Sequence, residues 1–444
     1  MSDQRHPESL SSPQIAARQF ERLRKLLDEV SATNEFWKRR FESAGLSSET
    51  LGSIDSLDQL QKIPFTHKSD LVADQAANGP YGTNLTYPVS SFARLHQTSG
   101  TTTGQPMRWL DTPDSWQWFM DCWAQIWRIA GLQPEDVLCF PFSFGPFIGF
   151  WAGFEGANRL GNLCLAGGGM TSQARLKLIA DNSATVVCCT PTYGLRLAEV
   201  AAEQNVNLTE SSVRLLVVAG EPGGSIPAVR QRLETAWGAR VIDHWGMTEI
   251  GALGIECVEN PGGLHLLETE CIVEIIDPVS GEPAKPNNNG GRDGELVITN
   301  LGRIGSPLIR YRTGDLVSTD SSVCPCGRSL VRLTGGILAR SDDMVTIRGN
   351  NVFPSSVEAV IREFTEIAEF RIEVHTVRSM HHLVIQLEAE PNIKVEQYSG
   401  LIERLSSAIK DRLNFTAEIK MATDPLPRFE LKGRRFVRVE SRDA

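Results

Sequence analysis

The chain has 444 residues, of which 41% are hydrophobic and 22% are charged, and its formal net charge at pH 7 is -10. This length exceeds that of one ordinary core, and it predicts a large domain joined to at least one smaller one. The negative charge argues against a general affinity for nucleic acid or for anionic membranes. We therefore expect a globular enzyme that binds neither.

The first residues, MSDQRHPESLSS, include no apolar segment of the kind found in secretory leaders, so we expect a cytoplasmic protein with reduced cysteines. The run from Val137 to Phe154 is nearly as apolar as a membrane-spanning helix. Pro141, Pro146 and several glycines interrupt this run, and they would leave backbone groups unpaired in lipid. We interpret the run as an aromatic pocket wall or a core segment.

Hydrophobic residues recur at helical spacing from Ile15 to Val30, and a second helical segment follows from Glu35 to Ser43. Between residues 137 and 245, short β-branched runs alternate with helical stretches such as 172–180 and 226–237. This alternation predicts a parallel sheet that is covered by helices on both faces.

After Gly254, strand-like runs are separated by turn sequences such as PNNNGGRDG, which predicts a small antiparallel β subdomain over about residues 255–335. A third pattern begins near Asp342, with one helix opened by a capping box, Ser355-x-x-Glu358, and another over 399–413. The predicted fold class is α/β. It has a large N-terminal domain over residues 1–341 and a small α+β C-terminal domain over residues 342–444, joined by a hinge.

Three motifs follow one another along the chain. RLHQTSGTTTGQP from Arg94 offers backbone N–H groups and hydroxyls that suit polyphosphate oxygens. DHWGMTEIG from Asp243 has a threonine and a glutamate on a turn, where they can contact a phosphate and a magnesium ion. YRTGDL from Tyr311 offers a carboxylate to both hydroxyls of a ribose. Each motif alone is an ordinary polar turn, but all three in this order, followed by ARSDD from Ala339 and by Lys432, predict an ATP site.

With these motifs the chain resembles the adenylate-forming superfamily of acyl-CoA synthetases, adenylation domains and luciferases. The resemblance is closest to the phenylacetate-CoA ligase family, through CCTPTYGLRLAE from Cys188, AGEPGG from Ala219, RSDDMVTIRGNNVFPSSVE from Arg340 and LPRFELKGRR from Leu426. It implies an ATP-dependent, AMP-forming acid–thiol ligase with ATP, Mg²⁺ and CoA as cofactors. Such an enzyme activates an aryl or arylacetic acid as acyl-AMP and then transfers the acyl group to CoA.

The resemblance also implies a nucleotide site whose residues are spread over the chain. The phosphate loop would comprise Ser99, Gly100, Thr101, Thr102, Thr103 and Gly104. The adenine site would be lined by Gly220, Glu221, Pro222, Asp243, His244 and Trp245, where Trp245 replaces the more usual tyrosine. Asp315 would bind the ribose, and Arg340 would lie near the nucleotide.

By the same resemblance, Thr248 contacts the α-phosphate, Glu249 binds the magnesium ion and Lys432 stabilises the adenylation transition state. A carboxylate that attacks the α-phosphate approaches another anion, so positive charge from magnesium and Lys432 offsets the repulsion. Lys432 lies in the small domain and acts only when that domain closes. Asp342 would be the hinge of the rotation that later admits the CoA thiol.

The acyl pocket is also assigned by position in the resembled family. Its residues would be Phe144, Phe147, Trp151, Tyr193, His244 and Gly246. Aromatic walls suit a small, flat aromatic carboxylic acid. Two interpretations of His244 and Ser143 stay open: they recognise a ring hydroxyl, amine or heteroatom, or they serve in packing.

Four residues have the chemistry of metal ligands: Cys257 and His265 in ECVENPGGLH, and Cys324 and Cys326 in CPCG. A C-x7-H pair combined with C-x-C can supply the Cys3His shell of a tetrahedral structural zinc. Both halves fall within the expected antiparallel subdomain, so we expect a structural zinc there. The alternative is a pair of reduced turn cysteines and an ordinary surface histidine.

Other functions remain open alongside the CoA ligase. One is an adenylating enzyme that loads the phosphopantetheine thiol of a carrier protein or another acceptor. A second is a non-catalytic nucleotide-binding relative, although such a protein has no need of Glu249, Asp315 and Lys432 together. The relatives also imply a homodimer.

Overall fold

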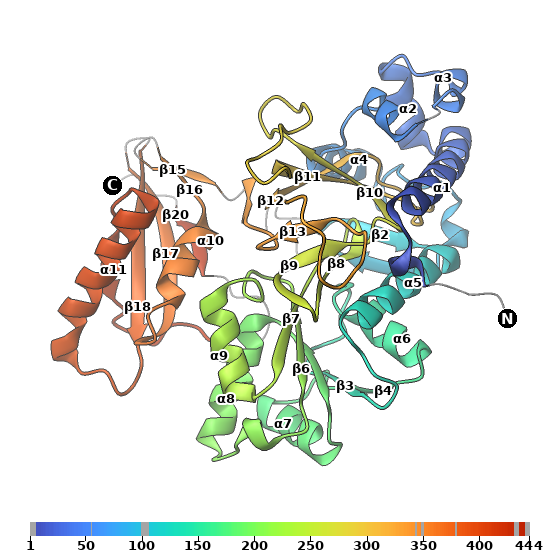
Figure 1. Ribbon diagram of the computed structural model, residues 1–444. Helices are drawn as coiled ribbons and strands as arrows, with labels where there is room; N and C mark the ends of the chain where they lie inside the picture. Colours follow the sequence, from blue (N-terminus) through green and yellow to red (C-terminus); the bar gives the residue numbers. More distant parts are fainter. Residues whose placement is uncertain are drawn as a thin grey trace.

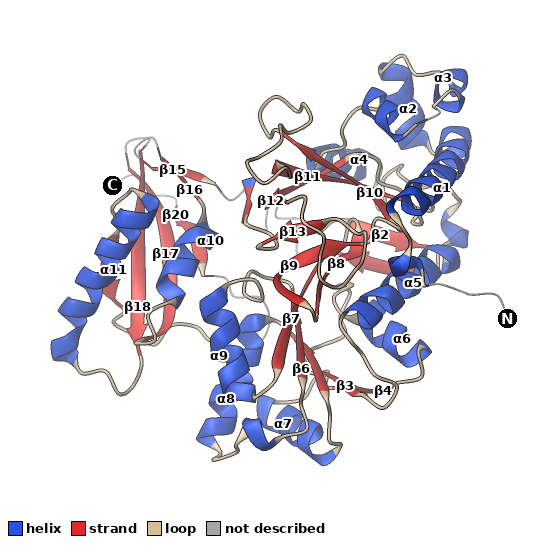
Figure 2. Ribbon diagram, in the orientation of Figure 1, coloured by secondary structure: helices blue, strands red, loops and turns tan. Residues whose placement is uncertain are grey.

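The computed structural model describes residues 6–54, 56–98, 106–341, 344–347, 350–377, 380–429 and 435–439. These residues form a larger body, in which helices surround several β-sheets, and a smaller body made by the C-terminal part of the chain (Figure 1, Figure 2). Among the described residues, no helix is long and apolar enough to cross a membrane. The run from Val137 to Phe154 forms a strand, a loop and the beginning of a helix.

Helices make up the first part of the larger body. They are α1 (Ser12–Thr33), α2 (Glu35–Ser43), α3 (Ser48–Gly52) and α4 (Lys68–Ala77), with short 3-10 turns at Pro7–Ser9, Leu57–Lys62 and Val89–Ser91. Asn34 begins α2 because its side chain accepts a hydrogen bond from the Trp37 amide. Arg18 and Arg22 of α1 form ion pairs with the buried Glu270, which ties these helices to the rest of the body. The two helices expected from the sequence up to Ser43 are confirmed.

One eight-stranded sheet forms the centre of the larger body. Its strands lie in the order β13 (Arg332–Thr334), β9 (Asn260–Leu266), β8 (Gly251–Cys257), β7 (Arg240–Met247), β6 (Leu215–Ala219), β5 (Val186–Cys189), β3 (Val137–Phe140) and β4 (Leu163–Ala166). The five strands from β7 to β4 are parallel to their neighbours. Strands β8, β9 and β13 extend the same sheet in antiparallel fashion.

Helices cover both faces of the parallel strands, as the sequence predicts. They are α5 (Pro113–Ile129) and α6 (Trp151–Arg159) on one face, and α7 (Ser172–Asp181), α8 (Pro191–Glu203) and α9 (Pro227–Trp237) on the other, with a 3-10 turn at Leu208–Glu210. Neighbouring residues of one strand pack into different cores: Leu138 and Phe140 contact the α5 side, whereas Cys139 contacts the α7 side. This two-sided burial explains why these strands are almost continuously apolar.

A separate four-stranded antiparallel sheet contains β10 (Cys271–Ile276), β11 (Asp293–Asn300), β12 (Tyr311–Ser318) and β14 (Ala339–Arg340), in that order. A further hairpin is formed by β1 (Arg94–Gln97) and β2 (Arg108–Asp111). The antiparallel region is thus divided between two sheets. A turn of only three residues joins β7 to β8, so β8 returns beside β7 in the large sheet.

The smaller body has its own hydrophobic core, built from residues between Val345 and Phe436. Its elements are β15 (Val345–Ile347), β16 (Asn350–Val352), α10 (Pro354–Arg362), β17 (Ile367–Val377), β18 (Met380–Ala389), a 3-10 turn at Val395–Gln397, α11 (Tyr398–Leu413), β19 (Glu418–Met421) and β20 (Phe436–Val439). The main sheet has the order β19-β18-β17-β20, and β15 pairs with β16.

The predicted capping box at the start of α10 is wrong. The helix begins at Pro354 with Phe353 as its N-cap residue, and no side chain caps it. Proline is favoured at this first position because its missing N–H would have no partner there. Ser355 therefore falls inside the helix, and its hydroxyl donates to the Leu338 carbonyl oxygen instead.

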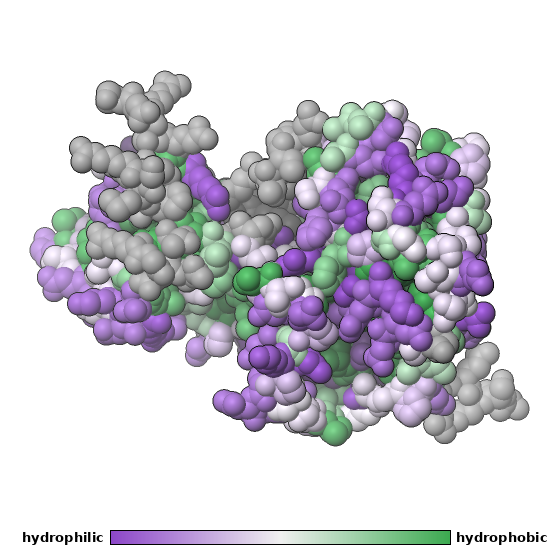
Figure 3. All heavy atoms as spheres, turned by 90° about the horizontal axis from the view of Figure 1, so that it is seen from above, coloured by the Kyte–Doolittle hydropathy of each residue, from purple (hydrophilic) through white to green (hydrophobic). Residues whose placement is uncertain are grey.

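The two bodies contact each other through charged and polar side chains. Arg232 of α9 lies 3.6 Å from Glu390, which follows β18. Arg435 Nη1, just before β20, donates to Thr192 Oγ1 of α8 at 2.9 Å. Seen from above, the smaller body lies to one side of the larger one, and hydrophilic side chains cover much of the visible face (Figure 3). Contacts of this polar kind are typical of domains that move relative to one another.

Candidate functional site

The turn between β7 and β8 carries Thr248 and Glu249, the residues predicted to contact phosphate and magnesium. The turn lies at the carboxyl end of β7, on the side of the sheet where α/β proteins commonly bind ligands. Glu249 is only 3% exposed, and its Oε1 lies 3.3 Å from Nζ of Lys68 at the start of α4. Lys68 supplies the positive charge that a buried carboxylate needs.

Lys68 was not singled out in the sequence, although its position carried a signal. It is the first residue of α4, where a positive charge opposes the helix dipole. A lysine in this unfavourable place indicates a partner elsewhere in the fold, and that partner is Glu249.

Three predicted nucleotide residues lie together at Asp315, which is 2% exposed. Arg340 Nη1 donates to Asp315 Oδ1 at 2.9 Å, and Trp245 Nε1 donates to Asp315 Oδ2 at 3.1 Å. The pairing of β12 with β14 puts Asp315 directly opposite Arg340. Trp245 reaches the same carboxylate from the large sheet. Tryptophan replaces the usual tyrosine at position 245. The consequence is that an indole N–H, and not a phenol hydroxyl, contacts the Asp315 carboxylate.

Asp243, predicted to line the adenine site, contacts the glycine-rich segment that contains Gly220 to Pro222. Ser225 Oγ donates to Asp243 Oδ2 at 2.5 Å. A Cβ atom on Gly224 would lie 2.4 Å from Asp243 Oδ1, so only glycine fits there. Gly220 has a φ of 95°, which also favours glycine. Glu221 accepts a hydrogen bond from the Thr192 amide, which holds this segment against α8.

Burial raises the pKa of Asp243 to about 7, and the hydrogen bond from Ser225 opposes this shift. Because the folded protein keeps a proton that the unfolded chain releases near pH 4, the free energy of unfolding falls as the pH rises from about 4 to about 7. Asp243→Asn should remove this dependence, which is worth at most about 4 kcal/mol. Urea unfolding of both proteins at pH 5 and pH 8 measures it. An equal difference between the two pH values in both proteins would contradict the raised pKa.

An aromatic cluster lies beside this region, on the α6 side of the sheet. Phe144 and Trp151, two predicted pocket residues, meet edge to face with ring centroids 4.6 Å apart. Phe142 links Phe144 to Phe150, whose ring lies 6.4 Å from that of His244. The structure therefore connects three of the predicted pocket residues through one set of ring contacts.

His244 lies at the inner end of this cluster, with its ring 4.6 Å from that of Trp123. Its Nδ1 is 2.7 Å from the Gly254 carbonyl oxygen. Burial lowers the pKa of His244 to about 4, so the ring is neutral at pH 7. Since the carbonyl can only accept, Nδ1 carries the hydrogen and Nε2 keeps a free lone pair.

The other predicted pocket residues have different surroundings. Phe147 is 47% exposed. A Cβ atom on Gly246 would lie 2.7 Å from the Gly251 carbonyl oxygen, so the backbone packs too closely there for a side chain. Tyr193 is buried in the core on the α7 side, and its hydroxyl contacts Arg175 Nη1 at 2.6 Å and Ser172 Oγ at 3.1 Å.

The four predicted metal ligands come together in one cluster. One ligand atom from each of Cys257, His265, Cys324 and Cys326 lies within 4.8 Å of all the others. Cys257 Sγ is 3.6 Å from Cys324 Sγ, and Cys326 Sγ is 3.4 Å from His265 Nε2. In a tetrahedral zinc shell such atoms are about 3.5–3.8 Å apart, which is close to the two measured pairs, and small side-chain shifts would bring the other atoms to this distance.

The tautomer of His265 also suits a zinc ligand. Its Nδ1 lies 3.1 Å from the Leu330 carbonyl oxygen, to which it donates, and this leaves Nε2 facing the cysteines as an acceptor. Zinc-bound histidines usually have such a partner on the other ring nitrogen. Both the spacing and the donor set therefore fit a zinc ion.

Some predicted residues lie outside the described part of the chain: Ser99, Gly100, Thr101, Thr102, Thr103, Gly104, Asp342 and Lys432. The structure does describe the two residues that flank the predicted phosphate loop, Thr98 and Met107. Thr98 N donates to the Met107 carbonyl oxygen at 2.9 Å, and Met107 N donates to Thr98 Oγ1 at 3.0 Å. The loop is therefore closed at its base by the β1–β2 hairpin.

Comparisons with known proteins identify the family. The model of the AMP-binding enzyme matches residues 46–302, and that of the AMP-binding enzyme C-terminal domain matches residues 349–439. The chain is 32% identical to the phenylacetate-coenzyme A ligase of Thermus thermophilus over 432 residues, which cover 93% of this chain and 94% of that one. It is 31% identical to the phenylacetate-coenzyme A ligase of Pseudomonas putida over 434 residues, covering 96% and 94%.

A solved structure matches the whole chain. The crystal structure of 2-hydroxyisobutyryl-CoA ligase in the postadenylation state, in complex with 2-HIB-AMP, has a TM-score of 0.90 at 27% identity and covers 100% of this chain and 94% of that one. The same ligase with 2-HIB-AMP and CoA in the thioesterification state has a TM-score of 0.72, covering 98% and 92%. As a whole, the chain is therefore more similar to the structure in the postadenylation state than to the one in the thioesterification state.

The fold and these matches define the class: the protein is an ATP-dependent, AMP-forming acid–thiol ligase. The chain belongs to the AMP-binding enzyme family, in which it is similar to the phenylacetate-CoA ligases. The resemblance stated from its motifs is thereby confirmed.

Proposed function

We propose that this ligase activates a small aryl or arylacetic acid with ATP and transfers the acyl group to CoA. The observation that carries the proposal is the meeting of Trp245, Asp315 and Arg340 beside the turn of Thr248 and Glu249, next to an aromatic cluster. Relatives at 32% and 31% identity are named phenylacetate-coenzyme A ligases. Both facts favour the same reaction and the same class of acid.

In the first half-reaction the carboxylate of the acid attacks the α-phosphorus of ATP, and pyrophosphate leaves. Asp315 would accept hydrogen bonds from the ribose hydroxyls, and the Thr248 hydroxyl would donate to the α-phosphate. Lys432 would stabilise the charge that develops on the phosphate in the transition state. Magnesium bound at Glu249 would supply the remaining positive charge, and Lys68 would have to yield that carboxylate to it.

The aromatic cluster favours a flat acid, because ring-to-ring packing adds to the burial of apolar area. Neutral His244 adds a hydrogen-bond acceptor at the inner end of the cluster. An acid with a ring hydroxyl or amine would satisfy this acceptor, whereas an unsubstituted ring would leave His244 in a packing role.

In the second half-reaction the thiol of CoA attacks the acyl carbonyl and AMP leaves. We propose a domain boundary between residues 341 and 342, with Asp342 as the hinge of the rotation between the two half-reactions. The contacts of Arg232 and Arg435 across the bodies would break in that rotation. The phosphopantetheine of a carrier protein is the alternative acceptor. The homodimer and the cytoplasmic location expected from the sequence stay predictions.

A panel of acids tests the proposal. Pyrophosphate release is measured with phenylacetate, benzoate, their hydroxyl and amino derivatives, and short aliphatic acids, each with and without CoA. We expect kcat/KM for the best aryl acid to exceed that for the best aliphatic acid by at least about 100-fold. An aliphatic acid as the best substrate would overturn the choice of acid. Acyl-AMP that accumulates without reacting with CoA would overturn the choice of acceptor.

We also propose that Cys257, His265, Cys324 and Cys326 bind one structural zinc. Four protein ligands close a tetrahedral shell and leave no position for water or substrate. The cluster joins the β8–β9 hairpin to the loop before β13, and its role would be to hold that loop.

A further inference from the structure

Arg303 is a fully buried arginine close to the proposed phosphate site. It is 0% exposed, and its guanidinium forms a two-pronged ion pair with Asp111, with Nε at 2.7 Å from Oδ1 and Nη2 at 2.8 Å from Oδ2. The rings of Trp109 and Phe119 lie 4.9 Å and 5.1 Å from its central carbon. A buried ion pair seldom adds net stability over apolar packing, so this arrangement points to a role beyond stability.

The remaining nitrogen of Arg303 supplies such a reason. Nη1 donates to two consecutive backbone carbonyl oxygens, that of Thr248 at 2.6 Å and that of Glu249 at 2.9 Å. Fixing two consecutive carbonyls fixes the peptide planes on both sides of Glu249. The direction in which the Glu249 side chain leaves the backbone is fixed with them, and the Thr248 side chain is restricted on one side.

Asp111, the partner of Arg303, belongs to the hairpin that closes the base of the phosphate loop. It is the last residue of β2, it is 0% exposed, and its Oδ2 lies 3.6 Å from Nδ1 of His96 on β1. The Arg303 guanidinium and His96 lower the pKa of Asp111 against the effect of burial. Arg303 thus contacts both the turn after β7 and the hairpin that carries the loop.

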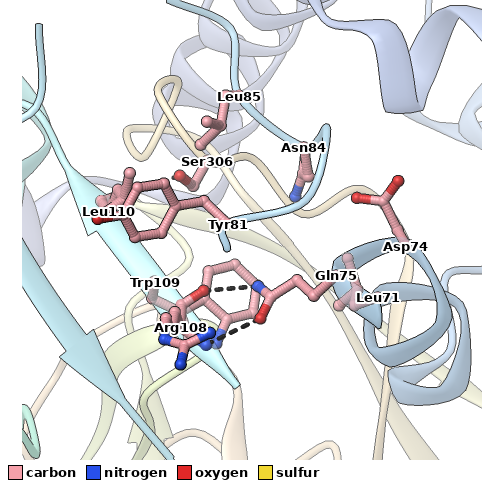
Figure 4. A pocket seen from close by; sticks show the side chains of 10 residues that line it. All are labelled: Leu71, Asp74, Gln75, Tyr81, Asn84, Leu85, Arg108, Trp109, Leu110 and Ser306. Atoms are coloured by element: carbon pink, nitrogen blue, oxygen red, sulfur yellow. Dashed lines mark hydrogen bonds between the residues drawn. The ribbon is translucent and has the colours of Figure 1, made fainter. Parts of the chain in front are cut away.

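The other end of β2 is fixed as well. Figure 4 shows the Gln75 side chain of α4 reaching the backbone of Arg108, with Nε2 donating to the carbonyl oxygen at 2.6 Å and the amide donating to Oε1 at 3.0 Å. Helix α4 also carries Lys68, the partner of Glu249. One strand, β2, is therefore tied at each end to an element that reaches Glu249.

We propose that Arg303 is a positioning residue of the ligase reaction, which sets the Thr248–Glu249 turn and the β1–β2 hairpin at the separation that the triphosphate and its magnesium ion require. This inference rests on the proposed roles of Thr248 and Glu249. Arg303 touches neither substrate nor ion, and it acts through the two carbonyls and through Asp111.

Arg303→Lys tests the proposal, because lysine keeps the charge but has three donors on a single nitrogen and cannot reproduce the four hydrogen bonds that the guanidinium makes to Asp111 and the two carbonyls. We expect the Mg²⁺ concentration that gives half-maximal ATP binding to rise about tenfold, since the carboxylate of Glu249 is no longer held in place. Calorimetric titration of ATP at a series of Mg²⁺ concentrations measures this. Transfer from supplied acyl-AMP to CoA involves neither the triphosphate nor its magnesium ion, and it should fall by a smaller factor than adenylation.

The matched control is Arg310→Lys. Arg310 is 5% exposed, forms an ion pair with Glu274 and donates to two backbone carbonyls, those of Gln61 and Ile63. The Arg310→Lys variant should lower the melting temperature as Arg303→Lys does, but the Mg²⁺ concentration that gives half-maximal ATP binding should stay the same. Asp111→Asn, which leaves Arg303 in place, should raise that requirement by a smaller factor.

An unchanged Mg²⁺ requirement in Arg303→Lys, or an equal rise in Arg310→Lys, would reduce Arg303 to a structural residue and overturn the inference. ATP binding needs no acid. The test of Arg303 is therefore valid even if no acid in the panel is activated. Failure to activate any acid would refute the proposed function and not the role of Arg303.

Discussion

Lys432→Ala should nearly abolish adenylation, lowering pyrophosphate release by about 100- to 1000-fold, the loss usual when one group that stabilises transition-state charge is removed. The acid and the α-phosphate are both negative, and no other residue is proposed to supply mobile positive charge at the attacking oxygen. Thioester formation from supplied acyl-AMP should remain close to the wild-type rate, because the body that carries Lys432 is proposed to have rotated before that step. Stopped assays of the two half-reactions separate these steps.

Lys420→Ala is the control for this prediction. Lys420 lies on β19 of the same body, about half exposed, with Glu418 as its neighbour at 3.9 Å. The Lys420→Ala substitution also removes one positive charge from the smaller body, and it should change the rate of neither half-reaction. A Lys432→Ala protein that adenylates at the wild-type rate would remove Lys432 from the mechanism. A similar loss in both half-reactions would indicate general damage.

The parallel part of the fold could be predicted because its signal is local. Strands such as β5, Val186–Cys189, are apolar throughout since they are buried on both faces, and helices with one apolar face separate them. The division of the antiparallel strands between two sheets could not be predicted in this way. It depends on which distant strands pair, as when Arg332 of β13 meets His265 of β9.

The same distinction applies to the candidate sites. The metal ligands could be found as two short motifs, but their meeting depends on the pairing of β13 with β9, which no local pattern encodes. Arg303 and Lys68 were not predicted as site residues, because their roles depend on contacts with residues that are distant in the sequence. Arg303 and Asp111 are 192 positions apart, and a single arginine after Gly302 looks like any surface charge until its partner is known.

The nucleotide site shows a third case. Asp315 and Trp245 were both named from motifs, yet the hydrogen bond between them was not foreseen, because a tyrosine is usual at the position of Trp245 and an indole places its N–H differently. Such a substitution changes which atoms meet without changing the motif's pattern. Detailed contacts of this kind require coordinates even where the family is evident.

Cys326→Ser should lower the bound zinc from about one ion per chain to well below one, and lower the melting temperature by about 5–10 °C. Serine is a poor zinc ligand at neutral pH, so the shell would keep three ligands and the loop before β13 would lose its attachment to β9. Elemental analysis of protein purified without added metal gives the occupancy, and calorimetry gives the melting temperature.

Cys164→Ser is the matched control, because Cys164 is also a half-buried free cysteine but lies outside the cluster. It should retain the zinc and melt near the wild-type temperature. Activity of Cys326→Ser at low temperature should be close to wild type, since a closed four-ligand shell does no chemistry and its loss acts only through stability. Wild-type protein stripped of metal that melts at the same temperature as protein given zinc would sink the proposal, and the contacts among these four side chains would then be those of ordinary packing.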